Sequence, residues 1–316
     1  MMYSTIGEII RHYRTSAHLS QNELAAGICD RKYISKIELN KCIPTLDIIN
    51  QLSDRLEINL YDSYALMLRH CNIETHKRIT KLNENFSSNH IKLKPLIEEY
   101  SELEEFKSGE PYQYLKYAEA LYAAYVLHDF PTAIEKASEG LHVADLHNSS
   151  QNQVRLSNIE ANLLLSYGVN NCRINNLEIG KSAFDYLLHY LHDLLSQHHY
   201  IVNRNYHYEQ NLLGLVTYNY FVFLRDFSSY EELLNLIEKA LNILDSLKNA
   251  ANVSDLLFCK TYLLYKLGNK DLAFETYHTA HSFSRYYYKD NYAEIETDIL
   301  DDIYEQIKAD ASICSY

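Results

Sequence analysis

The stretch LSQNELAAGICDRKYISKIE, residues 19–38, contains the clearest indication of the fold of the N-terminal part. Ser20 and Glu23 have the spacing of a capping box, which predicts that a short helix begins there. Gly27 predicts the end of that helix, because glycine adopts the left-handed backbone conformation without steric cost. A second helix is predicted over residues 31–38. Two of its apolar residues, three positions apart, face the core: Ile34 and Ile37.

Apolar residues on both sides of this stretch complete a small helical bundle. Before it, Thr5 and Glu8 form another capping box at the start of a predicted helix. After it, Pro44 and Thr45 start a further helix. The flanking apolar residues with helical spacing are Ile6, Ile9, Ile10, Tyr13, Leu46, Ile49, Leu52 and Leu56. Ile58 and Leu60 are expected to close the core. Two short helices inside a bundle of about five are the arrangement that a helix-turn-helix requires.

Residues 5–60 resemble the lambda-repressor-like, Xre-type helix-turn-helix family. The residues that carry the resemblance are Leu19-Ser20-Gln21, Leu24-Ala25, Tyr33-Ile34-Ser35-Lys36-Ile37-Glu38, Lys41, Pro44-Thr45, Leu52 and Leu56. The sequence departs from the family at Asn40-Lys41, where glycine usually follows the glutamate. Asparagine tolerates the same left-handed conformation, so the turn is still expected to form.

The resemblance implies that the helix over residues 31–39 enters the major groove of double-stranded DNA. The residues expected to face bases and phosphates are Arg31, Lys32, Tyr33, Ser35 and Lys36. Gln21 is expected to contact the DNA backbone, helped by the exposed amides at the start of its helix. Glu38 has a structural role in the family. The alternative is that the basic residues only form a solvated face of a small bundle.

Helical repeats are predicted in the rest of the chain. Residues 124–137, AYVLHDFPTAIEKA, pair with residues 264–277, LYKLGNKDLAFETY. Both follow the tetratricopeptide scheme, in which an aromatic residue on one helix is followed by a turn and an early alanine on the next. Residues 224–241 are a weaker copy, and residues 159–195 are a fourth candidate. Such helix pairs cannot bury their faces alone, so stacking into a superhelix with a concave surface is expected.

A helix-turn-helix followed by such repeats resembles the Gram-positive peptide-sensing regulators of the RRNPP group, and within it the PlcR-like proteins. The local matches are residues 123–127, Ile159-Glu160, Val216, Tyr218-Asn219 and Tyr230-Glu231-Glu232. The resemblance implies a homodimer that binds a palindromic operator. It also implies that the repeats bind a short signalling peptide after re-import and thereby control DNA binding.

In this family, asparagines on the inner helices hold the peptide backbone, because an amide can donate and accept hydrogen bonds at once. Asn219 is carried over from the Tyr-Asn pair, and Asn162 by a local alignment that slips by one residue. Three tyrosines are candidate groove aromatics by position alone: Tyr218, Tyr262 and Tyr265. Core packing is the alternative for the tyrosines, and an ordinary surface or interhelical amide is the alternative for Asn219.

The sequence therefore predicts an all-α protein with a lambda-repressor-like helix-turn-helix bundle and a tetratricopeptide-like superhelix. The helix-turn-helix domain is expected over residues 1–65 and a linker helix over residues 66–85. The peptide-binding and dimerisation domain is expected over residues 86–316. Residues 85–89 are the expected loop.

The charge distribution permits DNA binding by the N-terminal part. Of the chain's 29 basic and 42 acidic residues, seven of each lie in residues 1–60, which leaves 22 basic against 35 acidic residues beyond it. An acidic body suppresses indiscriminate binding to phosphate. The N-terminus lacks the pattern of a signal peptide and no apolar run could span a bilayer, so a cytoplasmic protein without membrane contact is expected. The six scattered cysteines are expected to be free thiols.

No motif for catalysis or a cofactor is present, and the chain is not expected to be an enzyme. The histidines around His189 and His192 could share a metal, but the carboxylate-histidine pattern of such sites is missing, and no metal is expected. The alternative function is a helix-turn-helix regulator whose repeats bind a protein partner or only mediate oligomerisation.

Overall fold

The computed structural model is helical throughout the part of the chain that it describes. It describes residues 6–42, 44–56, 58, 60, 73–87, 89–141, 156–197, 207–246, 250, 252–287, 299, 300, 303 and 305–307. These residues contain no strand, in agreement with the predicted all-α class. No described helix is both long enough and apolar enough to cross a membrane. The chain divides into two compact units, Met1–Ala118 and Glu119–Tyr316.

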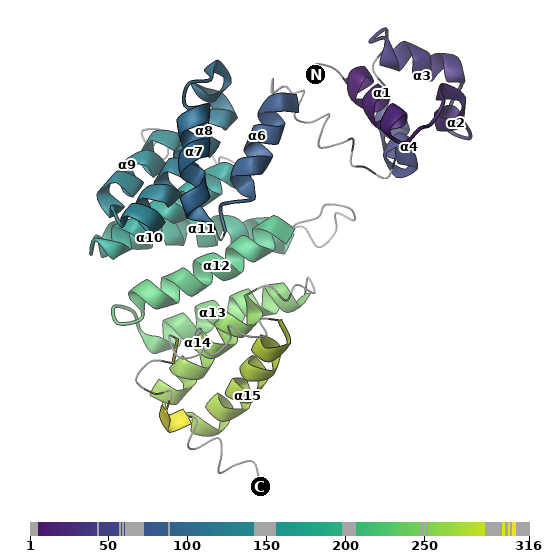
Figure 1. The fold of residues 1–316 in the computed structure, drawn as a ribbon. Coiled ribbons are helices and arrows are strands. Elements are labelled where there is room, and N and C mark those ends of the chain that lie inside the picture. The colour runs from purple at the N-terminus through teal and green to yellow at the C-terminus, as the bar shows by residue number, and fades with distance from the viewer. Residues whose placement is uncertain are drawn as a thin grey trace. The chain divides into compact units, whose positions relative to one another are not determined.

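The first unit begins with the predicted helical bundle. Its helices are α1 (Ile6–Ser16), α2 (Gln21–Ala25), α3 (Arg31–Glu38) and α4 (Leu46–Leu56). They enclose the predicted core, whose residues include Ile9, Ile10, Leu24, Ile34, Ile37, Ile49, Leu52 and Leu60. Figure 1 shows α1 to α4 grouped together as one bundle.

The local signals predicted for this bundle are confirmed. Ser20 and Glu23 form a reciprocal capping box at the start of α2. Gly27 and Asn40 both have the left-handed backbone conformation, with φ of 75° and 56°. Leu60 closes the core. Thr5, the proposed cap of α1, lies outside the described residues.

Helices α6 (Ile73–Asn83), α7 (Leu93–Tyr100) and α8 (Gly109–Tyr122) follow, with short 3₁₀ turns at η1 (His90–Lys92) and η2 (Glu104–Phe106). Helix α6 lies within the predicted linker, residues 66–85. It packs on its neighbours: Arg78 donates to Glu105 at 2.6 Å, and Leu82 is buried. The proposed boundary at residue 65 lies among residues 61–72, outside the described part, and stays a prediction.

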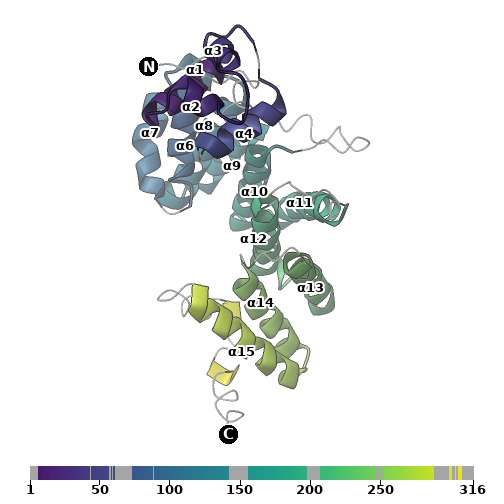
Figure 2. The same ribbon diagram turned by 90° about the vertical axis from the view of Figure 1, so that its right-hand side faces the viewer.

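The second unit is built from consecutive helix pairs. Its elements are a π-helical turn η3 (Ala123–Leu127), α9 (Phe130–Leu141), α10 (Asn158–Arg173), α11 (Leu177–Gln197), α12 (His207–Leu224), α13 (Tyr230–Ser246), α14 (Val253–Lys266) and α15 (Lys270–Tyr287). Helices α9, α11 and α13 each contact the helix that follows, and α12 also contacts α10 and α14. Figures 1 and 2 show α10 to α15 stacked in chain order.

The predicted tetratricopeptide-like stacking is therefore confirmed, and the two aligned repeats share their details. The turn residues His128 and Gly268 occupy the same aligned position, and both have a positive φ. Ala133 and Ala273, the early alanines of α9 and α15, are both fully buried. Ala133 packs against Ala123 and Ala124 of the preceding turn, and small side chains at such a contact allow the two segments to approach closely.

Two glycines allow α10 and α11 to approach closely. A Cβ atom on Gly180 would collide with the Sγ atom of Cys172 and would lie 2.9 Å from the carbonyl oxygen of Gly168. A Cβ atom on Gly168 would lie 2.9 Å from the ring of Phe184. The small residues thus determine how closely the central pair packs.

Gly180→Ala should lower the free energy of unfolding by about 1–3 kcal/mol, because the overlap with a main-chain oxygen outweighs the helix propensity gained. Urea denaturation followed by circular dichroism measures the change. Ser182→Ala, at an exposed position on the same helix, is the matched control and should change stability by less than about 0.5 kcal/mol. A Gly180→Ala chain as stable as the unsubstituted chain would contradict the close packing.

Candidate functional site

The outer surface of α3 presents a group of exposed basic side chains. Arg31, Lys32 and Lys36 are all exposed. Asp30 is the N-cap of the helix and accepts a hydrogen bond from the backbone N–H of Lys32 at 2.6 Å. Within the described part of the chain, none of the three basic side chains forms an ion pair. Their charges are therefore available to an anionic ligand.

The remaining residues predicted for this surface are less exposed. Ser35 is half-buried. Tyr33 is half-buried as well, and its ring packs against the core of the bundle. Gln21 donates from Nε2 to Oε2 of Glu38 at 2.8 Å. Because an amide nitrogen carries two hydrogens, Gln21 keeps one donor for a DNA phosphate. The DNA contacts of all these residues stay predictions.

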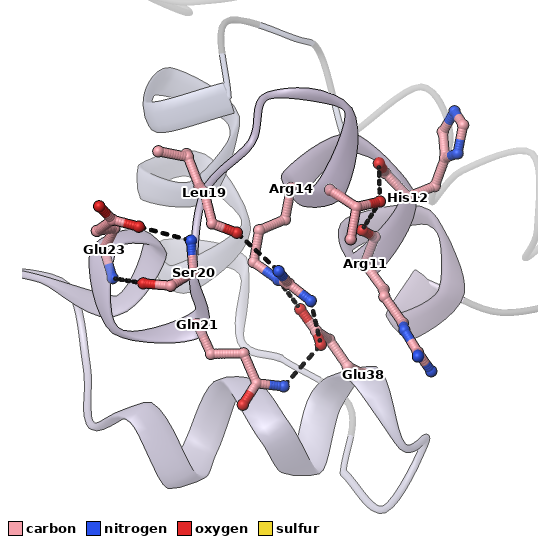
Figure 3. A network of polar contacts seen from close by, with 9 residues as sticks. Arg11, His12, Arg14, Leu19, Ser20, Gln21, Glu23 and Glu38 are labelled. Carbon is pink, nitrogen blue, oxygen red and sulfur yellow. Dashed lines mark hydrogen bonds and ion pairs between the residues drawn. The ribbon is translucent and has the colours of Figure 1, made fainter.

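Glu38 joins three helices of the bundle through its buried carboxylate, as Figure 3 shows. Arg14 of α1 donates to it from Nε at 2.6 Å and from Nη2 at 3.1 Å. Gln21 of α2 donates the third hydrogen bond. The side chains of Arg14 and Glu38 are only 12% and 3% exposed. Since buried charges require partners and hydrogen bonds, the pair holds α3 against α1 and α2.

A second candidate surface lies on α10 and α12. We call the accessible side of these helices the α10–α12 face and define it by Asn158, Asn162, Arg173, Leu215, Asn219 and Val222. The hydroxyl of Tyr208, on α12, lies 2.6 Å from the carbonyl oxygen of Asn158 and 2.8 Å from Oδ1 of Asn162. These contacts orient the Asn162 amide and leave its two N–H groups to donate to a ligand.

Asn219 lies on the same face, further along α12. It is half-buried, and its Nδ2 donates to the carbonyl oxygen of Leu215 at 2.8 Å. Within the described structure its Oδ1 and its second N–H form no further hydrogen bond, so the amide can both accept and donate. Leu215 and Val222 are exposed large apolar residues beside it. An accessible amide between apolar side chains is suited to bind a peptide backbone.

The three predicted groove tyrosines have different environments. Tyr218 is half-buried on α12. Tyr265 is also half-buried, and its hydroxyl donates to Oε1 of Gln306 at 3.1 Å. Tyr262 is only 4% exposed and packs edge-to-face against Phe221 and Tyr230. The structure thus favours the core-packing alternative for Tyr262, because stacked helices α12 to α14 cover its ring.

The two histidines considered as metal ligands lie in different environments: His189 is exposed, whereas His192 has a buried Nε2 atom with no hydrogen-bond partner among the described residues. His189 lies 3.3 Å from Asp193. Burial lowers the pKa of His192, and the nearby Lys239 lowers it further. No group of three or more possible metal ligands occurs among the described residues. His198 and His199 lie outside them.

Tyr208 and Arg173 were not found from the sequence. Tyr208 follows the poorly patterned residues 198–206, and its partners lie about fifty positions earlier in the chain. Only the contact between α10 and α12 brings them together. Arg173 is the last residue of α10, and a basic residue is common at the end of a helix, so the sequence did not distinguish it.

The comparison with known families identifies the class of the N-terminal part. A helix-turn-helix family model matches residues 10–62, which span most of the bundle from α1 to the core residue Leu60. The exposed basic helix α3 is the second helix of that motif. Residues 10–62 are therefore a helix-turn-helix domain. No curated protein matches the sequence of the chain.

Solved structures similar to the chain include those of PlcR, ComR and PrgX. Bacillus thuringiensis PlcR in complex with the peptide PapR7 and DNA is 19% identical with a TM-score of 0.60, covering 92% of this chain and 98% of PlcR. ComR from S. thermophilus in complex with DNA and its signalling peptide ComS is 16% identical with a TM-score of 0.50, covering 99% and 100%. The PrgX/cCF10 complex is 14% identical with a TM-score of 0.51, covering 94% and 99%. The predicted PlcR-like fold is confirmed.

Glu38→Ala should leave the Arg14 charge and the Gln21 amide without their acceptor. The free energy of unfolding of the helix-turn-helix should fall by about 3 kcal/mol, as expected when one partner of a buried ion pair is removed. Hydrogen–deuterium exchange of the α1 and α3 amides in the full chain measures this decrease. Asn22→Ala, at an exposed position of α2, is the control. Unaltered exchange in the Glu38→Ala chain would refute a structural role for the carboxylate.

Proposed function

We propose that this chain is a DNA-binding transcription regulator controlled by a short signalling peptide that binds the α10–α12 face. The main support for DNA binding is the exposed basic side of α3. There, Arg31, Lys32 and Lys36 have no acidic partner in the described structure. In a helix-turn-helix, this helix enters the major groove. PlcR and ComR, whose folds the chain shares, were solved in complex with DNA and a peptide.

In the proposed complex with DNA, Arg31, Lys32 and Lys36 contact bases and phosphates. Tyr33 and Ser35 contribute from the half-buried edge of α3, and Gln21 holds a phosphate at the start of α2. One small domain makes few phosphate contacts. We therefore propose a homodimer that places two domains on a palindromic operator.

The proposed peptide site uses the amides of Asn162 and Asn219 to hold an extended main chain. The contact with Tyr208 orients the Asn162 amide, whose two N–H groups can donate, and the Asn219 amide can both donate and accept. Tyr218 and Tyr265 border the site, and Tyr262 supports it from the core. Peptide binding controls DNA binding by favouring one of two dimer states, which requires a higher affinity for that state. We place the protein in the cytoplasm, where DNA and re-imported peptide meet.

The experiment that tests this function is the selection of genomic DNA fragments by the purified chain at fixed salt. It is run with and without a peptide extract of the host's spent medium. Enrichment of a palindromic site that changes with the extract is the expected result. A site that is indifferent to the extract would favour repeats that bind a protein partner. No enriched site would refute DNA-specific regulation.

The double variant Arg31→Ala, Lys36→Ala should bind the selected site at least about tenfold more weakly, since it lacks two cations that face bases and phosphates. Its salt dependence should also become shallower, by about one unit of the logarithmic slope for each phosphate that the variant no longer neutralises. Fluorescence anisotropy at several salt concentrations measures both quantities. Lys239→Ala, at an exposed position of α13, should leave them unchanged. Equal affinity of the double variant and the unsubstituted chain would exclude α3 from the DNA interface.

Asn219→Ala should shift the response of DNA binding to about tenfold higher concentrations of the peptide extract, while leaving DNA affinity without extract unchanged. The physical reason is the removal of an amide that both donates to and accepts from the peptide main chain, which is expected to weaken peptide binding about tenfold. The same anisotropy assay with titrated extract measures the response. Asn235→Ala replaces an exposed asparagine on α13 and is the matched control. An unshifted response from Asn219→Ala would remove this residue from the site.

A further inference from the structure

Arg173 is held between two aromatic rings at the end of α10. Its guanidinium carbon lies 4.8 Å from the ring centre of Tyr125 and 5.2 Å from that of Phe130. Tyr125 belongs to the π-helical turn η3 and Phe130 is the first residue of α9. Stacking on aromatic faces fixes the plane of a guanidinium while leaving its edge free to donate hydrogen bonds. A π-helical turn is rare and is often found at functional sites.

The hydrogen-bonding capacity of Arg173 is nearly unused. Its one hydrogen bond in the described structure is a long contact of 3.4 Å from Nη1 to Oδ1 of Asn170. No carboxylate among the described residues forms an ion pair with it, although the chain beyond residue 60 is rich in acidic residues. A guanidinium has five N–H donors in a planar fork that matches a carboxylate. The guanidinium of Arg173 is therefore able to bind a carboxylate group of a ligand.

Arg173 is on the same side of α10 as Asn162. Eleven residues separate them, which is about three helical turns, or roughly 16 Å along the axis. A fully extended peptide of about five residues spans that distance. One ligand can therefore contact both residues.

Arg173 is also level with Asn219 of the neighbouring helix. Tyr208 of α12 contacts Asn162, and Asn219 lies eleven residues after Tyr208, just as Arg173 lies eleven residues after Asn162. The two helices run in the same direction, because α11 is antiparallel to both. The beginning of α11 contacts the end of α10 at Gly180 and the end of α12, where Phe184 packs on Tyr220.

The next helix pair contains a second arginine that is stacked on aromatic rings near the end of a helix, and this arginine has a hydrogen-bond acceptor. Arg225 follows the end of α12 and lies over the rings of Phe221 and Tyr262. From Nη1 it donates to the carbonyl oxygen of Ile299, at 3.2 Å. The chain's own C-terminal segment thus supplies a main-chain oxygen to an aromatic-stacked arginine. The helix dipole also favours a cation at the end of α10, but this effect requires neither the two stacked rings nor an open fork.

We propose that Arg173, held by Tyr125 and Phe130, is the anchor for a carboxylate of the bound peptide. This proposal rests on the proposed function of the α10–α12 face as a peptide site and adds the chemistry of the ligand. The carboxylate is the peptide's C-terminus or an aspartate or glutamate side chain.

The test uses the full chain, immobilised, and three synthetic pools of random seven-residue peptides. One pool has a free C-terminus and lacks aspartate and glutamate. The second has an amidated C-terminus and includes them, and the third is amidated and lacks them. The retained peptides are quantified by mass spectrometry. The unsubstituted chain should retain one of the first two pools above the third, and which pool it retains identifies the source of the carboxylate.

Arg173→Gln should abolish that preference while still retaining peptides of the third pool at the original level. For an individual peptide from the preferred pool, affinity should fall about ten- to a hundredfold, as expected for a charge-assisted hydrogen-bonded pair. Arg173→Lys keeps the charge without the planar fork and should recover only part of the affinity. Arg285→Gln, at an exposed position on α15, should behave like the unsubstituted chain. An unchanged thermal midpoint confirms that each variant is folded.

The outcomes separate the anchor from the peptide site itself. If the unsubstituted chain shows no preference among the pools, or if Arg173→Gln keeps the preference, the anchor is wrong and the peptide site stands. If the unsubstituted chain retains no pool, the proposed peptide function fails, and the anchor fails with it.

Discussion

A pair of antiparallel helices leaves apolar surface on both of its broad sides, and the second unit is organised by the need to cover that surface. Each pair buries one side against the pair before it and the other against the pair after it. Ala133, Ala240 and Ala273, on the second helices of their pairs, are fully buried in this stack. The first helices of the pairs also touch one another, as α10, α12 and α14 do. The proposed ligand residues Asn162, Arg173 and Asn219 remain half-buried, and thus partly accessible, after these contacts are made.

The helix-turn-helix must also cover the apolar surfaces of its helices, and it has fewer residues to do so. A bundle this small has little apolar surface to bury, and Glu38 adds a polar connection between α1, α2 and α3. The carboxylate uses hydrogen bonds from Arg14 and Gln21 inside the domain. This arrangement fixes the roll of α3 about its own axis, with Ile34 and Ile37 inward. The basic residues Arg31, Lys32 and Lys36 are then outward as a consequence of the same packing.

Two arginines of the second unit show how the repeats present positive charge in an acidic body. Arg173 and Arg225 both lie at the ends of first helices, stacked on aromatic rings. Stacking reduces the entropy that a long side chain loses when it binds a partner. Arg225 has its partner within the chain, at Ile299. Arg173 keeps most of its N–H donors available in the described structure. The net negative charge of this part of the chain disfavours non-specific binding of polyanions such as nucleic acid. Both properties suit the selective recognition of one small carboxylate ligand.

The helical class, the helix-turn-helix and the repeated helix pairs could be predicted from the sequence, because each depends on signals within about forty residues. The capping box at Ser20, the left-handed turns at Gly27 and Asn40, and the aligned alanines 133 and 273 are all local. The sequence also indicated Asn219, through its resemblance to a family. The different burial of the tyrosines depends on tertiary packing: Tyr262 and Tyr265 are three residues apart on one helix, yet Tyr262 is buried and Tyr265 is half-buried. Tertiary packing alone joined Tyr208 to Asn162 and Arg173 to Tyr125, because those contacts are made between helices whose register depends on the packing of the whole stack.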